Sequence, residues 1–131
     1  MELYGPTNLG AWLQSYNVLM TVLVMIDAVD LGHLQKYRSH IERLAERYGP
    51  RVWSVIYQGD VRCRLEHMER LKRALNTKHD KVINAGGKSD YDEQRPWNQV
   101  WARATADETF WRVEVIEPCM LIITGPHLKP Q

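Results

Sequence analysis

The apolar residues near the start of the chain recur at helical spacing and predict a first helix from residue 9. One stripe consists of Leu9, Trp12, Leu13, Tyr16, Leu19, Leu23 and Ile26. A second stripe follows another side of the same segment and consists of Val18, Val22, Met25 and Val29. A helix that is apolar on two sides is ordinarily surrounded by other elements, so we expect this helix to be the central one. Thr7 or Asn8 is the expected N-cap.

The next segment carries a single apolar stripe, which predicts an amphipathic surface helix from residue 31 to residue 48. The stripe consists of Leu31, Leu34, Tyr37, Ile41, Leu44, Ala45 and Tyr48, and charged residues occupy the other positions. Asp30 is the expected N-cap of this helix. Gly49 and Pro50 predict that it ends and that another begins, because glycine suits the left-handed position after a helix and proline suits a first turn.

A third, longer helix is predicted from Pro50 to at least Leu75. Favourable pairs four residues apart support it, each by a few tenths of a kcal/mol. The pairs are Asp60/Arg64, Glu66/Arg70 and Glu69/Arg73. Gly59 inside this helix costs about 1 kcal/mol relative to alanine. Either a close helix crossing or simple tolerance explains its presence.

The periodic pattern is lost over residues 76–95, and Gly86-Gly87 interrupts any helix there, so this segment is predicted to be a flexible linker. Pro96 then opens a short helix that carries Trp97 and Trp101. The sequence Thr105-Ala-Asp-Glu108 matches a capping box and predicts the start of a further helix. Residues 119–124 are rich in β-branched and apolar side chains, so both a helix and a strand remain open for them.

These elements predict an all-α fold, a compact bundle of about five helices in a single domain over residues 1–131. The first and third helices are the long ones, and a shorter pair forms the C-terminal part. With 44% hydrophobic and 25% charged residues, the chain has the composition of a globular protein. Its length suffices for a sizeable core without disulfides or metal.

Cysteine use and hydropathy favour an intracellular protein, cytoplasmic or nuclear. Cys63 and Cys119 are far apart, and the first residues lack the basic and apolar regions of a signal peptide. The apolar run Val18–Ile26 is too short to span a bilayer. We therefore expect no membrane partner.

The charge distribution raises the question of nucleic-acid binding. The net charge is only +1, but a cluster of basic residues lies in the predicted third helix. Candidate phosphate-binding residues are Arg62, Arg70, Lys72, Arg73 and Lys78. Carboxylates are interleaved with them, so a solvated helix face is the alternative interpretation. The expected binding is weak and salt-dependent, because no base-reading motif is present.

Other candidate sites are sparse. Cys63 and His67 stand four residues apart on a predicted helix, which gives half of a zinc site, but no second ligand pair completes it. The alternative is a buried thiol beside a surface histidine. Asp27 follows the apolar run and is expected to be buried and paired with an arginine of the third helix. No catalytic motif is present, so no enzymatic activity, catalytic residue or cofactor is expected.

The tryptophans of the C-terminal part allow two interpretations. Trp97, Trp101 and Trp111 are candidates for an exposed partner-binding patch, since large aromatic residues dominate many interfaces. The alternative is that they form the core of the C-terminal helices.

Two stretches carry a resemblance to a known group of proteins. Residues 47–71, RYGPRVWSVIYQGDVRCRLEHMERL, resemble a segment repeated in many predicted proteins of dinoflagellate algae. Residues 95–101, RPWNQVW, with 110–114, FWRVE, and 117–118, resemble the segment that follows it there. The upstream residues 9–30 also fit, so the resemblance covers most of the chain. These proteins look like retroelement open reading frames, in which this domain precedes a zinc-knuckle-like segment and polymerase-like regions.

That position implies a Gag-like assembly or scaffold role, and the resemblance brings no catalytic residue with it. The sequence therefore predicts a non-enzymatic helical interaction domain that self-associates or docks onto a protein partner. A weak nucleic-acid-binding module that uses the basic helix over residues 50–81 is the alternative.

Overall fold

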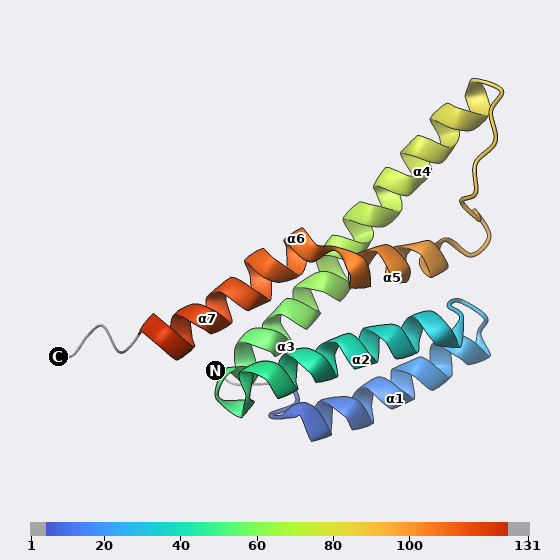
Figure 1. Cartoon of the computed structure of the whole chain (residues 1–131). Helices are drawn as coiled ribbons and strands as arrows, with labels where there is room; N and C mark the ends of the chain where they lie inside the picture. Colours follow the sequence, from blue (N-terminus) through green and yellow to red (C-terminus); the bar gives the residue numbers. More distant parts are fainter. Residues whose placement is uncertain (1–4, 126–131) are drawn as a thin grey trace.

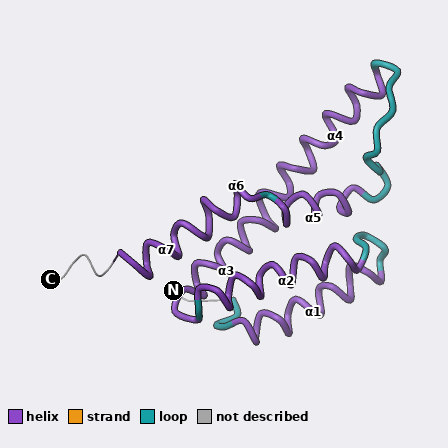
Figure 2. Tube along the Cα trace, in the orientation of Figure 1, coloured by secondary structure: helices purple, strands orange, loops and turns teal. Residues whose placement is uncertain are grey.

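The computed structural model describes residues 5–125 of the chain, and all regular structure within that range is helical. Figure 1 shows the course of the chain, and Figure 2 shows helices joined by loops, of which the one between α4 and α5 is the longest. The α-helices are α1 (Leu9–Met25), α2 (Leu31–Tyr48), α3 (Trp53–Arg62), α4 (Met68–Asn84), α5 (Pro96–Ala106), α6 (Glu108–Trp111) and α7 (Glu117–Thr124). A 3₁₀ turn, Pro50–Val52, leads into α3.

Two π-helical segments join some of these elements into longer helices. Cys63–His67 connects α3 to α4 without a break, and Arg112–Ile116 connects α6 to α7. The described chain therefore contains five helices, over residues 9–25, 31–48, 53–84, 96–106 and 108–124. This confirms the predicted all-α bundle. It also settles the open choice for residues 119–124, which are helical.

Helices α1 and α2 form a hairpin, and the longer α3–α4 helix crosses it. Helices α1 and α2 run side by side, the α3–α4 helix crosses α2, and α5 packs against both α2 and α4 (Figure 1). Helix α7 and the π-helical segment before it pack on α3. The far end of α4 projects from the body, and residues 85–95 return along it to α5.

The central helix is α2, which corrects the prediction that the first helix is surrounded. Helix α2 contacts α1, α3 and α5, and its residues Leu34, Tyr37 and Ile41 are completely buried. Helix α1 lies at the edge of the bundle and packs mainly on α2. Only one of its two apolar stripes faces the core. Of the second stripe, only Val29, which lies beyond the helix, is buried.

Helix ends follow the predicted signals in part. The Asn8 side chain caps α1 by accepting the Ala11 amide hydrogen at 2.9 Å, and Gly49 has a φ of 84° after α2. Asp30 is the N-cap residue of α2, as predicted, but its side chain makes no capping hydrogen bond, because its carboxylate binds Arg95 and Asn98 instead. The predicted capping box at Thr105 is wrong. Asp107 caps α6, and the Thr105 hydroxyl donates to the carbonyl of Trp101.

Gly59 marks a close crossing of two helices, which is one of the two explanations considered for it. A methyl group at this position would collide with the side chain of Val115, which is fully buried. The absence of a side chain therefore lets α3 approach the π-helical segment of the C-terminal helix. Burial against that helix offsets the helix-propensity cost of glycine.

The predicted linker over residues 76–95 is shorter than expected, since α4 continues to Asn84. The periodic pattern weakens there because the end of α4 projects and buries few apolar side chains. Within the remaining loop, Tyr91 is buried and the Asp90 carbonyl accepts a hydrogen bond from Gln99. The loop is thus attached to the body of the fold at its middle.

Candidate functional site

The outer face of α1 carries an apolar surface that the fold leaves uncovered. Val18, Val22 and Met25 are 66%, 47% and 78% exposed, and Ile26 at the end of the helix is 65% exposed. All 17 residues of α1 are uncharged. Exposed helix faces ordinarily carry charged residues, so this composition is unusual for a helix that lies at the edge of a bundle.

The spacing on this face resembles the seam of a coiled coil. Ala11, Ser15, Val18, Val22 and Met25 follow one another at alternating intervals of four and three residues. This interval places side chains in one line along a helix, ready to meet a second helix. Small residues occupy the first half of the line and larger apolar residues the second half. We call these five residues the α1 seam.

The inner face of α1 is fixed by buried aromatic side chains. Trp12 and Tyr16 are 1% and 2% exposed and stack on each other with ring centroids 4.7 Å apart. The Tyr16 hydroxyl donates to the Leu34 carbonyl at 2.8 Å. These contacts determine the rotation of α1 about its axis. They therefore hold the α1 seam on the solvent side.

A buried carboxylate connects α1, α2 and α3. Asp60 is completely buried, and its oxygens accept hydrogen bonds from Trp12 Nε1 at 2.9 Å and from the Tyr37 hydroxyl. Arg64 adds a bidentate pair, with Nε 2.9 Å from Oδ1 and Nη2 2.7 Å from Oδ2. The guanidinium also lies over the Tyr16 ring at 5.9 Å.

The chemistry of this cluster is that of a structural centre. Burial raises the pKa of Tyr16 and of Tyr37, so both hydroxyls stay protonated at neutral pH. Burial opposes the charge of Arg64, but its hydrogen bonds to Asp60 raise its pKa, so it stays charged. Both oxygens of Asp60 already accept two hydrogen bonds, which leaves no position for a reacting group.

The sequence predicted a buried carboxylate paired with an arginine of the third helix, but it placed the carboxylate at Asp27. That side chain is 81% exposed and pairs with Arg95. Its backbone φ of 58° ends α1 in a left-handed turn, which turns the residue outward. Asp60 takes the expected role. The 60/64 spacing indicated the ion pair, but its burial depends on Trp12 and Tyr37 from two other helices.

Cys63 and His67 do not form the half-site of a metal centre. Cys63 is completely buried, and burial raises the pKa of its thiol to about 12, so the thiolate that binds metal is scarce. The Nε2 atom of His67 lies 2.7 Å from the Asp107 carboxylate, and its ring stacks on Phe110. Among residues 5–125 no three potential ligands come together. The alternative of a buried thiol agrees with the structure.

Asp107 joins two elements at this point. Its carboxylate accepts the Phe110 amide hydrogen as the cap of α6 and also binds His67 on the π-helical segment before α4. Although burial raises the pKa of Asp107, these hydrogen bonds lower it below the usual value. The His67–Asp107 pair therefore positions the start of the C-terminal helix against the α3–α4 helix.

The candidate phosphate-binding residues do not act as one cluster. Arg62 forms an ion pair with Glu114 at 3.0 Å, and Lys72 lies over the Trp97 ring at 5.0 Å. Arg70 lies 3.4 Å from Nδ1 of His67. Arg73 and Lys78 are exposed. Three of the five side chains thus have contacts within the protein, and nucleic-acid binding stays a prediction.

Of the predicted helix pairs, only Asp60/Arg64 lies within 4 Å in the described residues.

The tryptophan patch is corrected for two of its three members. Trp101 and Trp111 are 5% and 2% exposed, and both rings pack against Tyr37 in the core. The Trp111 Nε1 donates to the Ala104 carbonyl at 2.9 Å, which satisfies its polar group. They offer no surface to a partner. Trp97 is half-buried beneath Lys72.

Comparisons with protein-family models, with curated proteins and with solved structures found no match for this chain. Within residues 5–125, no helix has both the length and the apolar character that crossing a bilayer requires.

The α1 seam is the functional candidate that sequence reasoning missed. The sequence pattern predicts that both apolar stripes of α1 are buried within one chain. The signal that distinguishes them was present, since the second stripe has the four–three spacing of a coiled-coil seam. That spacing does not say whether the second helix belongs to the same chain or to another one.

Proposed function

We propose that this protein is a helical assembly domain that self-associates through the α1 seam. The observation that carries the proposal is the exposure of Val18, Val22 and Met25 on an edge helix without a single charge. Contiguous apolar surface of this kind marks interaction sites in soluble proteins. The resemblance to Gag-like domains supports the same role.

A second copy of the chain is the occupant that fits this surface. An antiparallel pair of α1 helices sets the small residues of one seam, Ala11 and Ser15, against the larger residues of the other. Two-fold symmetry lets one patch serve both subunits, which is the commonest form of self-association. Two copies of an uncharged surface meet without electrostatic repulsion, whereas two copies of a surface with a net charge repel each other.

The expected affinity is low. A helix of 17 residues is about 25 Å long, and one pair of such helices buries less than the roughly 800 Å² per partner of a standard stable interface. The expected dissociation constant lies in the micromolar range. Weak individual contacts become effective when several copies are held together, as they are in an assembly.

Sedimentation equilibrium of the 131-residue chain over a range of concentrations tests the proposal. The average mass of the wild type is expected to rise with concentration towards that of a dimer. Val18→Glu places a charge in the middle of the seam and is expected to remain a monomer. Leu65→Glu is the matched control, because Leu65 is 70% exposed on another surface, and it is expected to associate like the wild type.

A cysteine variant tests the geometry. Two antiparallel seams bring the Val18 positions of the two copies close together, so Val18→Cys is expected to form a disulfide-linked dimer under mild oxidation. The native Cys63 and Cys119 are buried and do not compete. A wild type that stays monomeric at high micromolar concentration contradicts the proposal, as does undiminished association of Val18→Glu.

A further inference from the structure

A cavity of about 470 Å³ lies where the end of α4, the loop over residues 85–95 and α5 meet. Its lining includes the polar side chains of His79, Tyr91 and Gln99. These come from three different elements, none of which is α1. The volume falls within the range of small-molecule pockets.

This cavity gathers most of the unpaired polar atoms in the described chain. Four buried side-chain atoms lack a hydrogen-bond partner among the described residues, and three of them belong to this lining: His79 Nδ1, Tyr91 Oη and Gln99 Oε1. His79 is 9% exposed and Tyr91 is 6% exposed. Folded proteins rarely leave such atoms unpaired, and an unpaired group in a site indicates a partner from outside the chain.

The orientation of each group defines what that partner must offer. The Gln99 amide nitrogen donates to the Asp90 carbonyl at 3.1 Å, so its oxygen is the atom left to accept a hydrogen bond. His79 Nε2 faces Glu93 at 3.5 Å, which leaves Nδ1 as an acceptor in the neutral ring. Burial raises the pKa of Tyr91, so its hydroxyl remains a donor. The partner therefore carries both hydroxyl-type donors and an acceptor oxygen.

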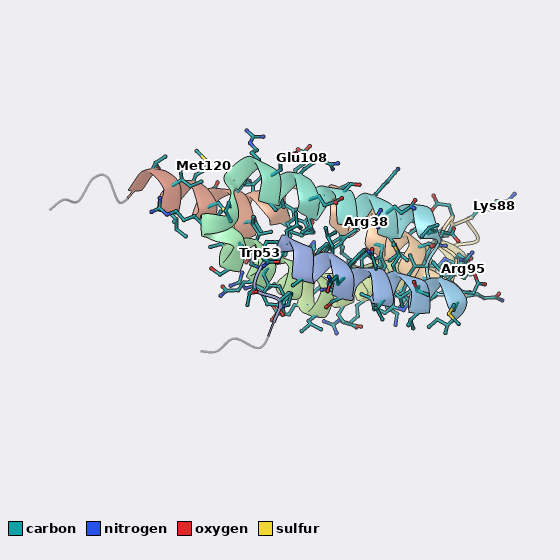
Figure 3. The ribbon with its side chains drawn as sticks, turned by 90° about the horizontal axis from the view of Figure 1, so that it is seen from below. Arg38, Trp53, Lys88, Arg95, Glu108 and Met120 are labelled. Atoms are coloured by element: carbon teal, nitrogen blue, oxygen red, sulfur yellow. The ribbon has the colours of Figure 1, made fainter. Side chains whose placement is uncertain are left out.

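The charged residues of the lining favour an anion. Lys78, Lys88 and Arg103 border the cavity, whereas Asp90 is the carboxylate of the lining and Glu93 lies 3.5 Å from His79. Within residues 5–125 none of the three cations lies within 4 Å of a carboxylate oxygen, as the ion pairs of this part of the chain involve other residues. Lys88 extends outward at the tip of the loop (Figure 3). Flexible cations around a partly buried polar floor are suited to a phosphate group.

We propose that this cavity binds a small hydroxylated phosphate ester. The phosphate lies among Lys78, Lys88 and Arg103 and accepts the Tyr91 hydroxyl hydrogen. The hydroxyl groups donate to Gln99 Oε1 and His79 Nδ1. Because the ligand contacts both the loop and α5, binding holds the loop against the body of the fold.

Calorimetric titration of the full chain at low ionic strength tests this site with ribose 5-phosphate, inorganic phosphate and ribose as probes. Ribose 5-phosphate is expected to bind saturably and at least tenfold more tightly than either of the other two. Tyr91→Phe removes only the unpaired hydroxyl, so the fold is kept, and affinity is expected to fall about tenfold. Tyr48→Phe on α2 is the matched control and is expected to bind like the wild type.

A second variant probes the charged border. The double change Lys88→Gln and Arg103→Gln is expected to weaken ribose 5-phosphate binding at least tenfold, and backbone amide NMR shifts on titration are expected at residues 75–103. The proposal is overturned when none of the probes binds, or when Tyr91→Phe binds as tightly as the wild type. A single-stranded oligonucleotide is titrated as a fourth probe. The proposal is overturned as well when the oligonucleotide binds and ribose 5-phosphate does not, since that result assigns the cations to nucleic acid.

Discussion

At the scale of single residues, Asp60 shows how one buried charge organises its surroundings. Its carboxylate receives hydrogen bonds from Trp12 on α1, Tyr37 on α2 and Arg64 one turn further along. Removing one member of a buried charged pair costs about 3–5 kcal/mol, because the other charge stays buried without compensation. The cluster therefore makes the packing of three helices interdependent.

Asp60→Asn tests this role. The amide leaves the Arg64 guanidinium, whose side chain is 26% exposed, without its counter-charge, and the free energy of unfolding is expected to fall by about 3 kcal/mol. Glu114→Gln removes the partner of Arg62 in a surface pair and is expected to cost at most about 1 kcal/mol. Urea denaturation at neutral pH measures both. Equal stability of the two variants would show that the buried cluster contributes no more to the free energy of unfolding than a surface ion pair does.

His40 makes the stability of the protein sensitive to mild acid. Burial, with a smaller effect of Arg43, lowers its pKa from 6.5 to about 4, and its ring packs edge-on against Trp111. Between these two pH values the unfolded chain binds a proton that the folded chain does not. Stability is therefore complete above pH 6.5 and falls as the pH decreases towards about 4.

The expected loss from His40 is about 1–2 kcal/mol, after allowance for the part of the ring that borders solvent. Protonation of carboxylates such as Asp107 also lowers the free energy of unfolding at acid pH. The wild type is therefore compared with His40→Leu, in which this position cannot titrate. Urea midpoints at pH 7, 6, 5 and 4 provide the comparison. As the pH falls, the wild type is expected to lose more stability than His40→Leu. Parallel pH profiles would refute the assignment.

At the scale of elements, two glycines in helices are expected to respond oppositely to the same substitution. Gly59→Ala forces the buried Val115 side chain to move, and overpacking of this kind costs about 1–3 kcal/mol, more than the gain in helix propensity. Gly32 on α2 has no neighbouring atom within 4 Å, so Gly32→Ala is expected to stabilise by up to about 1 kcal/mol. Thermal denaturation distinguishes the two outcomes.

A double variant checks the cause. Val115→Ala alone removes buried methyl groups and destabilises the protein. When it is combined with Gly59→Ala, the new methyl group occupies the space that Val115 leaves, so the combined cost is expected to be smaller than the sum of the single costs. Additive costs would mean that the two positions do not meet.

The elements were predictable to the extent that their causes are local. The helix boundaries at Asn8 and Gly49 depend on residues within one turn, and the 3.6-residue periodicity identified α2 from its stripe alone. The position of α1 was not predictable, because an apolar face has the same sequence pattern whether it packs on the same chain or on another one. The length of α4 was underestimated, because a helix that projects from the body shows little periodicity.

At the scale of the whole molecule, both proposed surfaces depend on contacts between distant parts of the chain. The cavity at the end of α4 forms because Tyr91 and Gln99 return to His79, and no local pattern joins these positions. The α1 seam exists as a free surface because Trp12 and Tyr16 turn the other face of α1 inward. The sequence alone thus predicted the fold class and the helices, but not the two surfaces.

The continuous helix formed by α3 and α4 crosses from the interior of the molecule to its edge. Ile56 and Cys63 in its first half are completely buried, whereas most side chains beyond His79 are exposed. One unbroken ladder of backbone hydrogen bonds therefore connects regions of very different local stability. Amide hydrogens near Ile56 are expected to exchange with deuterium only when the whole domain unfolds. Those of the last turn before Asn84 are expected to exchange through local fraying, orders of magnitude faster.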